Sequence, residues 1–306
     1  MNTQTKHSLM LMLCAFIWGT AFVAQSAGSG MGAYSFLAGR SWLAVIVLLP
    51  TVRAFDAVHR KQGVPFSGPA TNAERKTLLI AGLICGTLLF AASAAQQIGI
   101  TINPSTAKAG FLTAMYIVLV PILSLFLKKR VGANVYAGIL LALAGMYLLC
   151  VKEGFALGGG DVYALLAALM FALQIIVIDI FAPKVDNIRL SALQFLVCGA
   201  LSGALALGTE TQLARAYRDA LLPILYTGVL SSGVGYTLQI LGQRRCRPQM
   251  ASLLMSMESA FSAIFGFLIL HQKMTGRELT GCALMLAAVL LAQWKPRGER
   301  KTDESV

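Results

Sequence analysis

Four ionisable side chains lie inside otherwise apolar stretches of this chain, and their chemistry has to be explained first. Glu258 is the deepest, with largely apolar residues on both sides, whereas Lys108, Arg40 and Asp179 lie nearer the ends of their stretches. An ionisable group inside a bilayer is unfavourable unless it faces the protein interior or a water-filled cavity. Glu258 is therefore a candidate for binding an amine or carrying a proton. A neutral carboxylic acid that only hydrogen-bonds to a neighbouring helix is the structural alternative.

The three other ionisable groups are open to simpler interpretations. Lys108 could attract a carboxylate, but its long side chain could equally reach the lipid headgroups. We predict that Arg40 is a structural ion-pair partner and that Asp179 is a structural residue at the membrane interface.

Polar and aromatic side chains form matching stripes in the two halves of the chain. A shift of 143 positions places Ser93 on Tyr236 and Gln96 on Gln239. Residues three or four apart share a helix face, so both pairs lie on stripes. The match favours a cavity shared by both halves, although helix packing would give the same pattern. The candidate cavity residues are Trp18, Gln96, Tyr116, Phe171, Gln174, Ser232, Tyr236, Gln239 and Gln243, of which the aromatic ones could stack on an organic solute.

Ten hydrophobic stretches, each of membrane-spanning length, position these residues. A span needs about 20 apolar residues. Only 12% of the residues are charged, against about 25% in soluble proteins. The same shift lays Gly138 on Gly281. We predict an all-α integral membrane protein with ten transmembrane helices in two inverted five-helix repeats, residues 1–152 and 153–295, and a charged cytoplasmic tail, residues 296–306. The expected spans are 8–25, 33–52, 78–100, 106–127, 131–151, 161–181, 190–207, 220–241, 250–270 and 276–294.

Small residues and one proline add detail to these spans. Gly82 and Gly86, like Gly199 and Gly203, are four residues apart, a spacing that lets helix backbones approach closely. We expect this packing within one monomer, with a homodimer as the open alternative. Pro121 removes a backbone hydrogen bond and is expected to kink its helix.

The basic residues are distributed asymmetrically. If the N-terminus is cytoplasmic, 18 Lys and Arg fall on the cytoplasmic side and 6 on the other, with Arg40 inside a helix. This asymmetry follows the positive-inside rule, so both termini are predicted to be cytoplasmic in an inner cell membrane. The net charge of +12 is therefore explained by topology, and nucleic acid is not expected as a partner.

Enzyme signatures are absent from the sequence. It contains no phosphate-binding G-x-x-x-x-G-K-[ST] loop, no G-x-S-x-G elbow and no H-E-x-x-H zinc motif. The six cysteines are scattered singly, which indicates neither a disulfide framework nor a metal site. We expect no enzymatic activity and no cofactor, so transport would depend on a gradient or be facilitative.

The chain resembles the EamA-domain transporters of the drug/metabolite transporter superfamily over about residues 8–294. The resemblance rests on four stretches, which are residues 15–23 followed by 36–40, 109–121, 160–169 and 251–258. It implies ten helices in two inverted halves, a central cavity, and export or uptake of small organic metabolites. The chain departs from the family pattern in two ways. Glutamates commonly follow the spans that correspond to 106–127 and 250–270, and here those places hold Lys129 and Gln272. Ser259 stands in place of a common proline, which would leave the span 250–270 straighter.

These observations predict a secondary carrier for a small organic solute, working by alternating access. An amino acid or related zwitterion is the preferred substrate, because Glu258 and Lys108 could bind its two ends. The alternatives are a cationic drug or amine exporter, in which Glu258 acts alone, and a membrane scaffold or sensor without transport. The expected partners are the solute and the lipid bilayer, with protons as an open candidate for the coupling ion.

Overall fold

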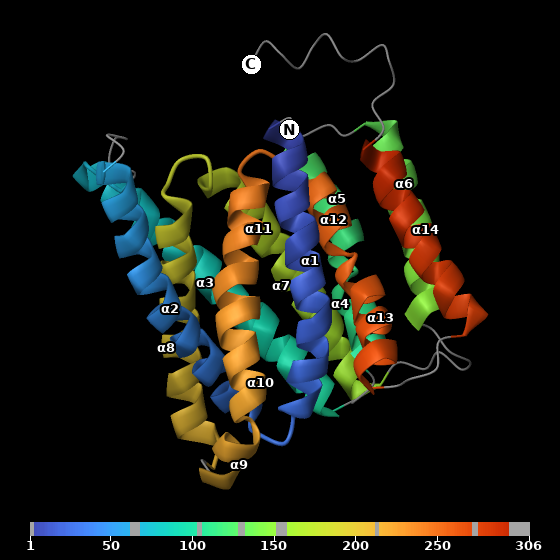
Figure 1. Ribbon diagram of the computed structural model, residues 1–306, viewed down its shortest axis with the longest axis horizontal. Helices are drawn as coiled ribbons and strands as arrows, with labels where there is room; N and C mark the ends of the chain where they lie inside the picture. The colour runs from blue at the N-terminus through green and yellow to red at the C-terminus, as the bar shows by residue number, and fades with distance from the viewer. Residues whose placement is uncertain are drawn as a thin grey trace.

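The computed structural model describes residues 3–61, 68–102, 106–127, 132–150, 158–211, 214–270 and 275–293, and in these parts it is entirely helical. The helices form a single bundle (Figure 1). They are α1 (Thr3–Ala27), α2 (Ala33–Lys61), α3 (Asn72–Ile102), α4 (Thr106–Thr113), α5 (Tyr116–Phe126), α6 (Ala133–Cys150), α7 (Gly159–Phe181), α8 (Asn187–Thr209), α9 (Ala214–Asp219), α10 (Leu221–Tyr226), the π-helix η1 (Thr227–Gly235), α11 (Tyr236–Gln243), α12 (Pro248–Met255), α13 (Glu258–Leu270) and α14 (Gly276–Gln293).

The ten predicted spans each have a counterpart in the bundle. Five helices and the combined segment α10–η1–α11 are each long and apolar enough to cross a membrane. Two further crossings are made by the pairs α4–α5 and α12–α13, and the last two by α6 and α14. In Figure 1 α1 runs downward from the top, and the chain then alternates in direction until α14 ends at the top. Because the first half makes five crossings, the second half is inverted relative to it.

Close contact between α6 and α14 reveals the internal symmetry of the fold. These two helices pack side by side at the right of Figure 1. A Cβ atom at Gly145 would lie 2.7 Å from the Gly281 carbonyl oxygen, and one at Gly138 would lie 2.9 Å from that of Ala288. The shift of 143 positions exchanges the two contacts, since Gly138 corresponds to Gly281 and Gly145 to Ala288. The sequence repeat is therefore also a repeat of packing contacts.

The predicted glycine pairs also pack inside the monomer. A Cβ atom at Gly86 in α3 would come within 2.8 Å of the Gln194 carbonyl oxygen in α8, and one at Gly82 would meet Leu193. Gly199 in α8 faces Trp42 of α2. Small residues thus let α8 contact two helices of the other repeat at short range.

The helices α2 and α8 are tied together at both ends. At one end, the Glu210 carboxylate accepts hydrogen bonds from the backbone N–H groups of Tyr34 (2.9 Å) and Ser35 (2.8 Å), which caps the start of α2. At the other end, Arg189 forms an ion pair with Asp56, with 2.6 Å between the charged atoms. Each tie joins the two repeats, and the two helices pack together at the left of Figure 1.

Three crossings are interrupted near their middle. In α4–α5 the break falls at Ala114 and Met115, where backbone bonds such as Met115 N–H to Leu112 O (3.2 Å) span three residues instead of four. The break therefore precedes Pro121, where we had expected a kink, and Pro121 lies within α5. Another interruption is η1, whose wider turns replace part of an α-helix. The remaining one lies between α12 and α13.

The break between α12 and α13 corrects the expectation that the predicted span 250–270 would be straighter without a proline at position 259. The interruption falls at Ser256 and Met257, directly before Glu258. The hydroxyls of Ser252 and Ser256 donate to the carbonyls of Gln249 (2.9 Å) and Leu253 (2.8 Å). Such bonds compete with the regular backbone ladder and bend helices. Serine hydroxyls therefore accompany an interruption that we had associated with proline.

Candidate functional site

The interrupted crossings α4–α5 and α12–α13 meet at Glu258. Glu258 is the first residue of α13 and Tyr116 is the first residue of α5, so each follows its break directly. The Tyr116 hydroxyl donates a hydrogen bond of 2.9 Å to Glu258 Oε1. Both side chains are buried, with 3% of Tyr116 and 4% of Glu258 exposed. A buried carboxyl group from one repeat is thus held by a phenol from the other.

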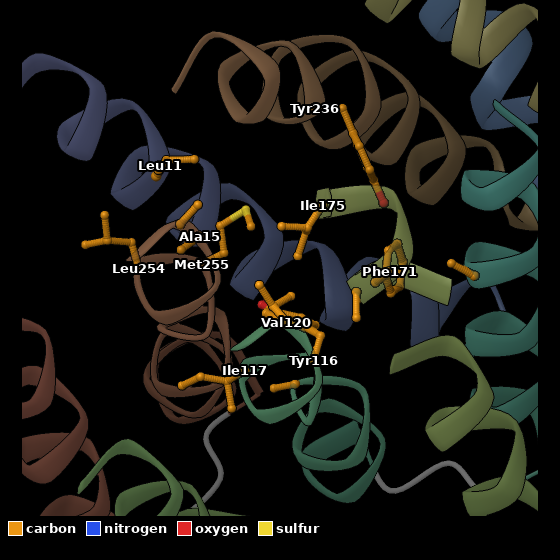
Figure 2. Close-up of a cluster of buried hydrophobic side chains, with 14 of the residues drawn as sticks. Leu11, Ala15, Tyr116, Ile117, Val120, Phe171, Ile175, Tyr236, Leu254 and Met255 are labelled. Atoms are coloured by element: carbon orange, nitrogen blue, oxygen red, sulfur yellow. The ribbon is translucent and has the colours of Figure 1, made fainter. Parts of the chain in front are cut away.

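An aromatic wall adjoins this pair. The ring centroids of Trp18 and Tyr236 are 4.6 Å apart, and Phe195 meets Tyr236 edge-on at 5.3 Å. Figure 2 shows Tyr116, Phe171 and Tyr236 reaching from different helices toward the same interior region. Such rings offer stacking surfaces to an organic solute.

The π-helix η1 changes which serine faces the interior. The Ser231 carbonyl accepts the π-type bond from the Tyr236 N–H and also a 3.3 Å bond from Trp18 Nε1. Ser231 lines the cavity, whereas Ser232, which α-helical spacing places on the stripe with Tyr236, is fully buried away from it. The wider turn of η1 rotates the stripe by about one residue.

Arg40 supplies a positive charge to the same region. It lies in α2, is 3% exposed, and donates from Nη1 to Gln25 Oε1 (3.3 Å) and from Nη2 to Ser93 Oγ (3.1 Å). Its Nε is buried without a hydrogen-bond partner. The predicted ion pair is wrong within the part of the chain that the structure describes, because both of its partners are neutral side chains. Sequence alone did not point to a cavity position for Arg40.

These groups enclose a central cavity of about 30 Å³, which is room for only one or two water molecules. Its wall contains one acidic residue, Glu258, and one basic residue, Arg40, among the described side chains. The lining residues are Trp18, Ala21, Phe22, Gln25, Arg40, Gln96, Thr113, Tyr116, Phe171, Ile175, Ser231, Tyr236, Gln239, Met255 and Glu258.

The structure brings together most of the residues that the sequence marked as candidates for the cavity, for substrate binding or for coupling. Those that line the cavity are Trp18, Gln96, Tyr116, Phe171, Tyr236, Gln239 and Glu258. Gln174 does not line it, because its Nε2 donates to Gln194 Oε1 at 3.2 Å in a buried pair between α7 and α8.

Other residues that the sequence marked as candidates lie away from the cavity or outside the described residues. Gln243 is buried outside the cavity. Lys108 belongs to α4, but its side chain lies outside the described residues, as do Lys129, Gln272 and the tail 296–306.

Comparison with known proteins gives a consistent answer. The model of the EamA-like transporter family matches residues 5–151 and again residues 158–294. A protein from Archaeoglobus fulgidus named as an uncharacterized transporter is 27% identical over 285 residues, which cover 92% of this chain and 84% of that protein. A solved crystal structure with 18% identity has a TM-score of 0.75 and covers 94% of this chain and 96% of its own, a likeness that concerns the fold. The chain therefore belongs to the EamA-like transporter family of the drug/metabolite transporter superfamily, a family of transporters and not of enzymes.

Proposed function

We propose that this transporter is a secondary carrier that works without ATP and exports a small organic metabolite, such as an amino acid, by alternating access. The observation that carries the proposal is the Tyr116–Glu258 hydrogen bond, which joins the two repeats at the wall of the central cavity. Inverted-repeat carriers bind their substrates near the membrane midplane, where the repeats meet and helices are discontinuous. Glu258 is the residue that we assign to substrate binding or proton coupling.

The small size of the cavity supports a cycle of opening and closing. Sites for small organic molecules occupy about 300–1,000 Å³, so the present cavity of about 30 Å³ has to widen before it accepts a solute. The breaks in α4–α5 and α12–α13 and the π-helix η1 adjoin it, and such irregular segments often serve as hinges. We assign the present conformation to a contracted state between the two open ones.

Two other functions make different predictions. In a cationic amine exporter, Glu258 would act alone and the substrate would need no anionic group. A membrane scaffold or sensor would not move solute at all. The connected polar and aromatic cavity favours a carrier over a scaffold, because a scaffold has no need for polar groups converging inside the bundle.

Reconstitution into proteoliposomes tests the proposal. Exchange of labelled amino acids and amines across the bilayer is measured with empty liposomes and the Glu258→Gln variant as references. Exchange of at least one solute class by the wild-type protein supports a carrier. A folded protein that exchanges none of them in either direction contradicts it.

Further parts of the proposal concern placement in the membrane. We propose an inner-membrane location with both termini cytoplasmic, on the 18-to-6 split of basic residues. We also propose that the repeats divide at residue 152 and that the packing glycines act within one monomer, with a homodimer as the alternative. Protons are the candidate coupling ion, because Glu258 could carry one.

A further inference from the structure

Arg40 is a buried cation whose hydrogen-bonding capacity is mostly unused. A guanidinium group has five N–H donors, and Arg40 uses one for Gln25 and one for Ser93. Its Nε donor is fully enclosed and has no partner. A buried charge with neutral partners is unfavourable, whereas one with a hydrogen-bonded anion is compensated. The arrangement therefore lacks an anion.

None of the described carboxylates is paired with Arg40. Arg189 forms ion pairs with Asp56 and Asp186, and Arg215 forms one with Asp219, and none of these residues lines the cavity. The cavity's own carboxyl group, Glu258, hydrogen-bonds to Tyr116. Tyr236 lines the same cavity as Arg40 and Glu258. The cavity thus contains one guanidinium group and one carboxyl group that are not joined to each other.

We propose that Arg40 is the carboxylate-binding residue of the cavity and that the transported solute is an amino-acid zwitterion, with its carboxylate on Arg40 and its ammonium group on Glu258. The proposal rests on the proposed function of a small-molecule carrier and names the substrate class and the anchor residue. In this proposal Arg40 binds the carboxylate of the solute, a role that the sequence had suggested for Lys108.

The chemistry of the two groups favours a zwitterion over a simple cation or anion. A cationic amine would satisfy Glu258 but would bring a second positive charge close to the uncompensated Arg40. A simple anion would satisfy Arg40 but would meet the Glu258 carboxyl group. A solute with both charges compensates both residues and remains neutral overall. The planar guanidinium also matches a carboxylate with two parallel hydrogen bonds, and Gln25 and Ser93 hold it in position.

The first test changes the ligand and leaves the protein intact. The twenty L-amino acids are screened for stabilisation and exchange in reconstituted wild-type protein. The strongest is then compared with its carboxamide, its decarboxylated amine and its N-acetyl derivative. We expect each derivative to be exchanged at least about tenfold less well, because each leaves one buried charge without its partner.

The second test asks which residue binds the carboxylate of the solute. In Arg40→Gln the preference for the amino acid over its carboxamide should collapse to about twofold or less. Arg40→Lys keeps the positive charge but loses the planar guanidinium group, so it should retain a weakened preference for the amino acid. This variant replaces Arg40→Gln in the test if Arg40→Gln does not fold. Arg215→Gln is the matched control, since this removes a positive charge from a side chain that is 91% exposed. Lys108→Gln tests the earlier assignment and should keep the full preference.

The possible outcomes separate this inference from the proposed function. If the decarboxylated amine is exchanged as well as the amino acid, the zwitterion proposal is overturned while the carrier stands. If the preference collapses in Lys108→Gln but survives in Arg40→Gln, or is undiminished in Arg40→Lys, the anchor is Lys108 and the assignment to Arg40 is wrong. If no amino acid, amine or N-acetyl derivative is exchanged by folded protein, the carrier itself is contradicted.

Discussion

Tyr116 and Glu258, from opposite repeats, are joined by a hydrogen bond of 2.9 Å, and each begins the helix that resumes after a break. The break in α4–α5 includes Ala114, and the break in α12–α13 includes its repeat equivalent, Met257. The two crossings are therefore interrupted at matching depths and face each other there. This geometry couples the carboxyl group to the relative position of the repeats, so movement of one repeat against the other would act directly on the bond.

The first prediction concerns the charge of Glu258. Glu258→Gln keeps the shape of the side chain and can still accept the Tyr116 bond, so we expect normal insertion and folding. Transport should fall at least about tenfold, because the neutral amide no longer offers a charged partner to the ammonium group of the solute. A hydrogen bond to a charged group contributes about 1.5–3 kcal/mol. Exchange in proteoliposomes, with and without a pH gradient, measures the effect. A variant that still exchanges solute but no longer responds to the gradient would assign Glu258 to proton coupling.

Tyr116→Phe is the matched control for this prediction. It removes the hydrogen bond but keeps the aromatic ring and the Glu258 carboxyl group, so a few-fold loss of transport is expected with the pH response retained. Full, pH-responsive transport by Glu258→Gln would show that the charge is unnecessary and that the carboxyl group only supports packing.

The second prediction concerns access to the cavity. Single cysteines at Gln96 and Gln239, in a background without native cysteines, should react with small water-soluble thiol reagents. Because the cavity in this conformation is only about 30 Å³, the reaction would report opening, and a transported solute should slow it. A cysteine at Gln174 should stay inert, since this residue is paired with Gln194 outside the cavity. Inert cysteines at both cavity positions in an active protein would make the stripes packing contacts.

Much of this architecture was predictable because it depends on composition and periodicity. Ten apolar runs define the crossings, and the 143-residue shift defines the repeats. The helix breaks were not predictable in the same way. They depend on hydroxyl-to-carbonyl bonds such as that of Ser256 and on three-residue backbone bonds, which an apolar pattern does not specify. The π-helix η1 was likewise not predictable, and because of it Ser231 lines the cavity where α-helical spacing had suggested Ser232.

Arg40 shows a different limit of sequence reasoning. A cation inside an apolar stretch looks the same whether it pairs with a carboxylate or faces a cavity. The distinction depends on Gln25 and Ser93, which come from other helices and are 15 and 53 residues away in the chain. Only the packed bundle shows that both partners are neutral.

The third prediction concerns the contact between α6 and α14. Gly145→Ala should destabilise the protein by about 1–3 kcal/mol, as overpacking does, because the new Cβ would lie 2.7 Å from the Gly281 carbonyl oxygen. Gly208→Ala is the control, since nothing lies within 4 Å of a Cβ at that exposed helical position. Thermal unfolding in detergent compares the two variants. Equal stability of both would mean that the two helices separate easily and do not form a rigid pair.

The last prediction concerns the orientation of the protein in the membrane. The bundle shows which segments lie at the same end but not which side of the membrane that end faces. The first turn of α1 and the last turn of α14 lie at the same end of the bundle (Figure 1). The 18-to-6 split of basic residues assigns that end to the cytoplasm. A reporter fused after Val306 should therefore be active only in its cytoplasmic form, and a tag inserted at residues 152–160 should be labelled from the outside of intact cells. A second tag between residues 62 and 67, which lie between α2 and α3, should stay protected until the membrane is permeabilised. Opposite results at all three sites would reverse the orientation, whereas the first two sites on one side would contradict inverted five-helix repeats.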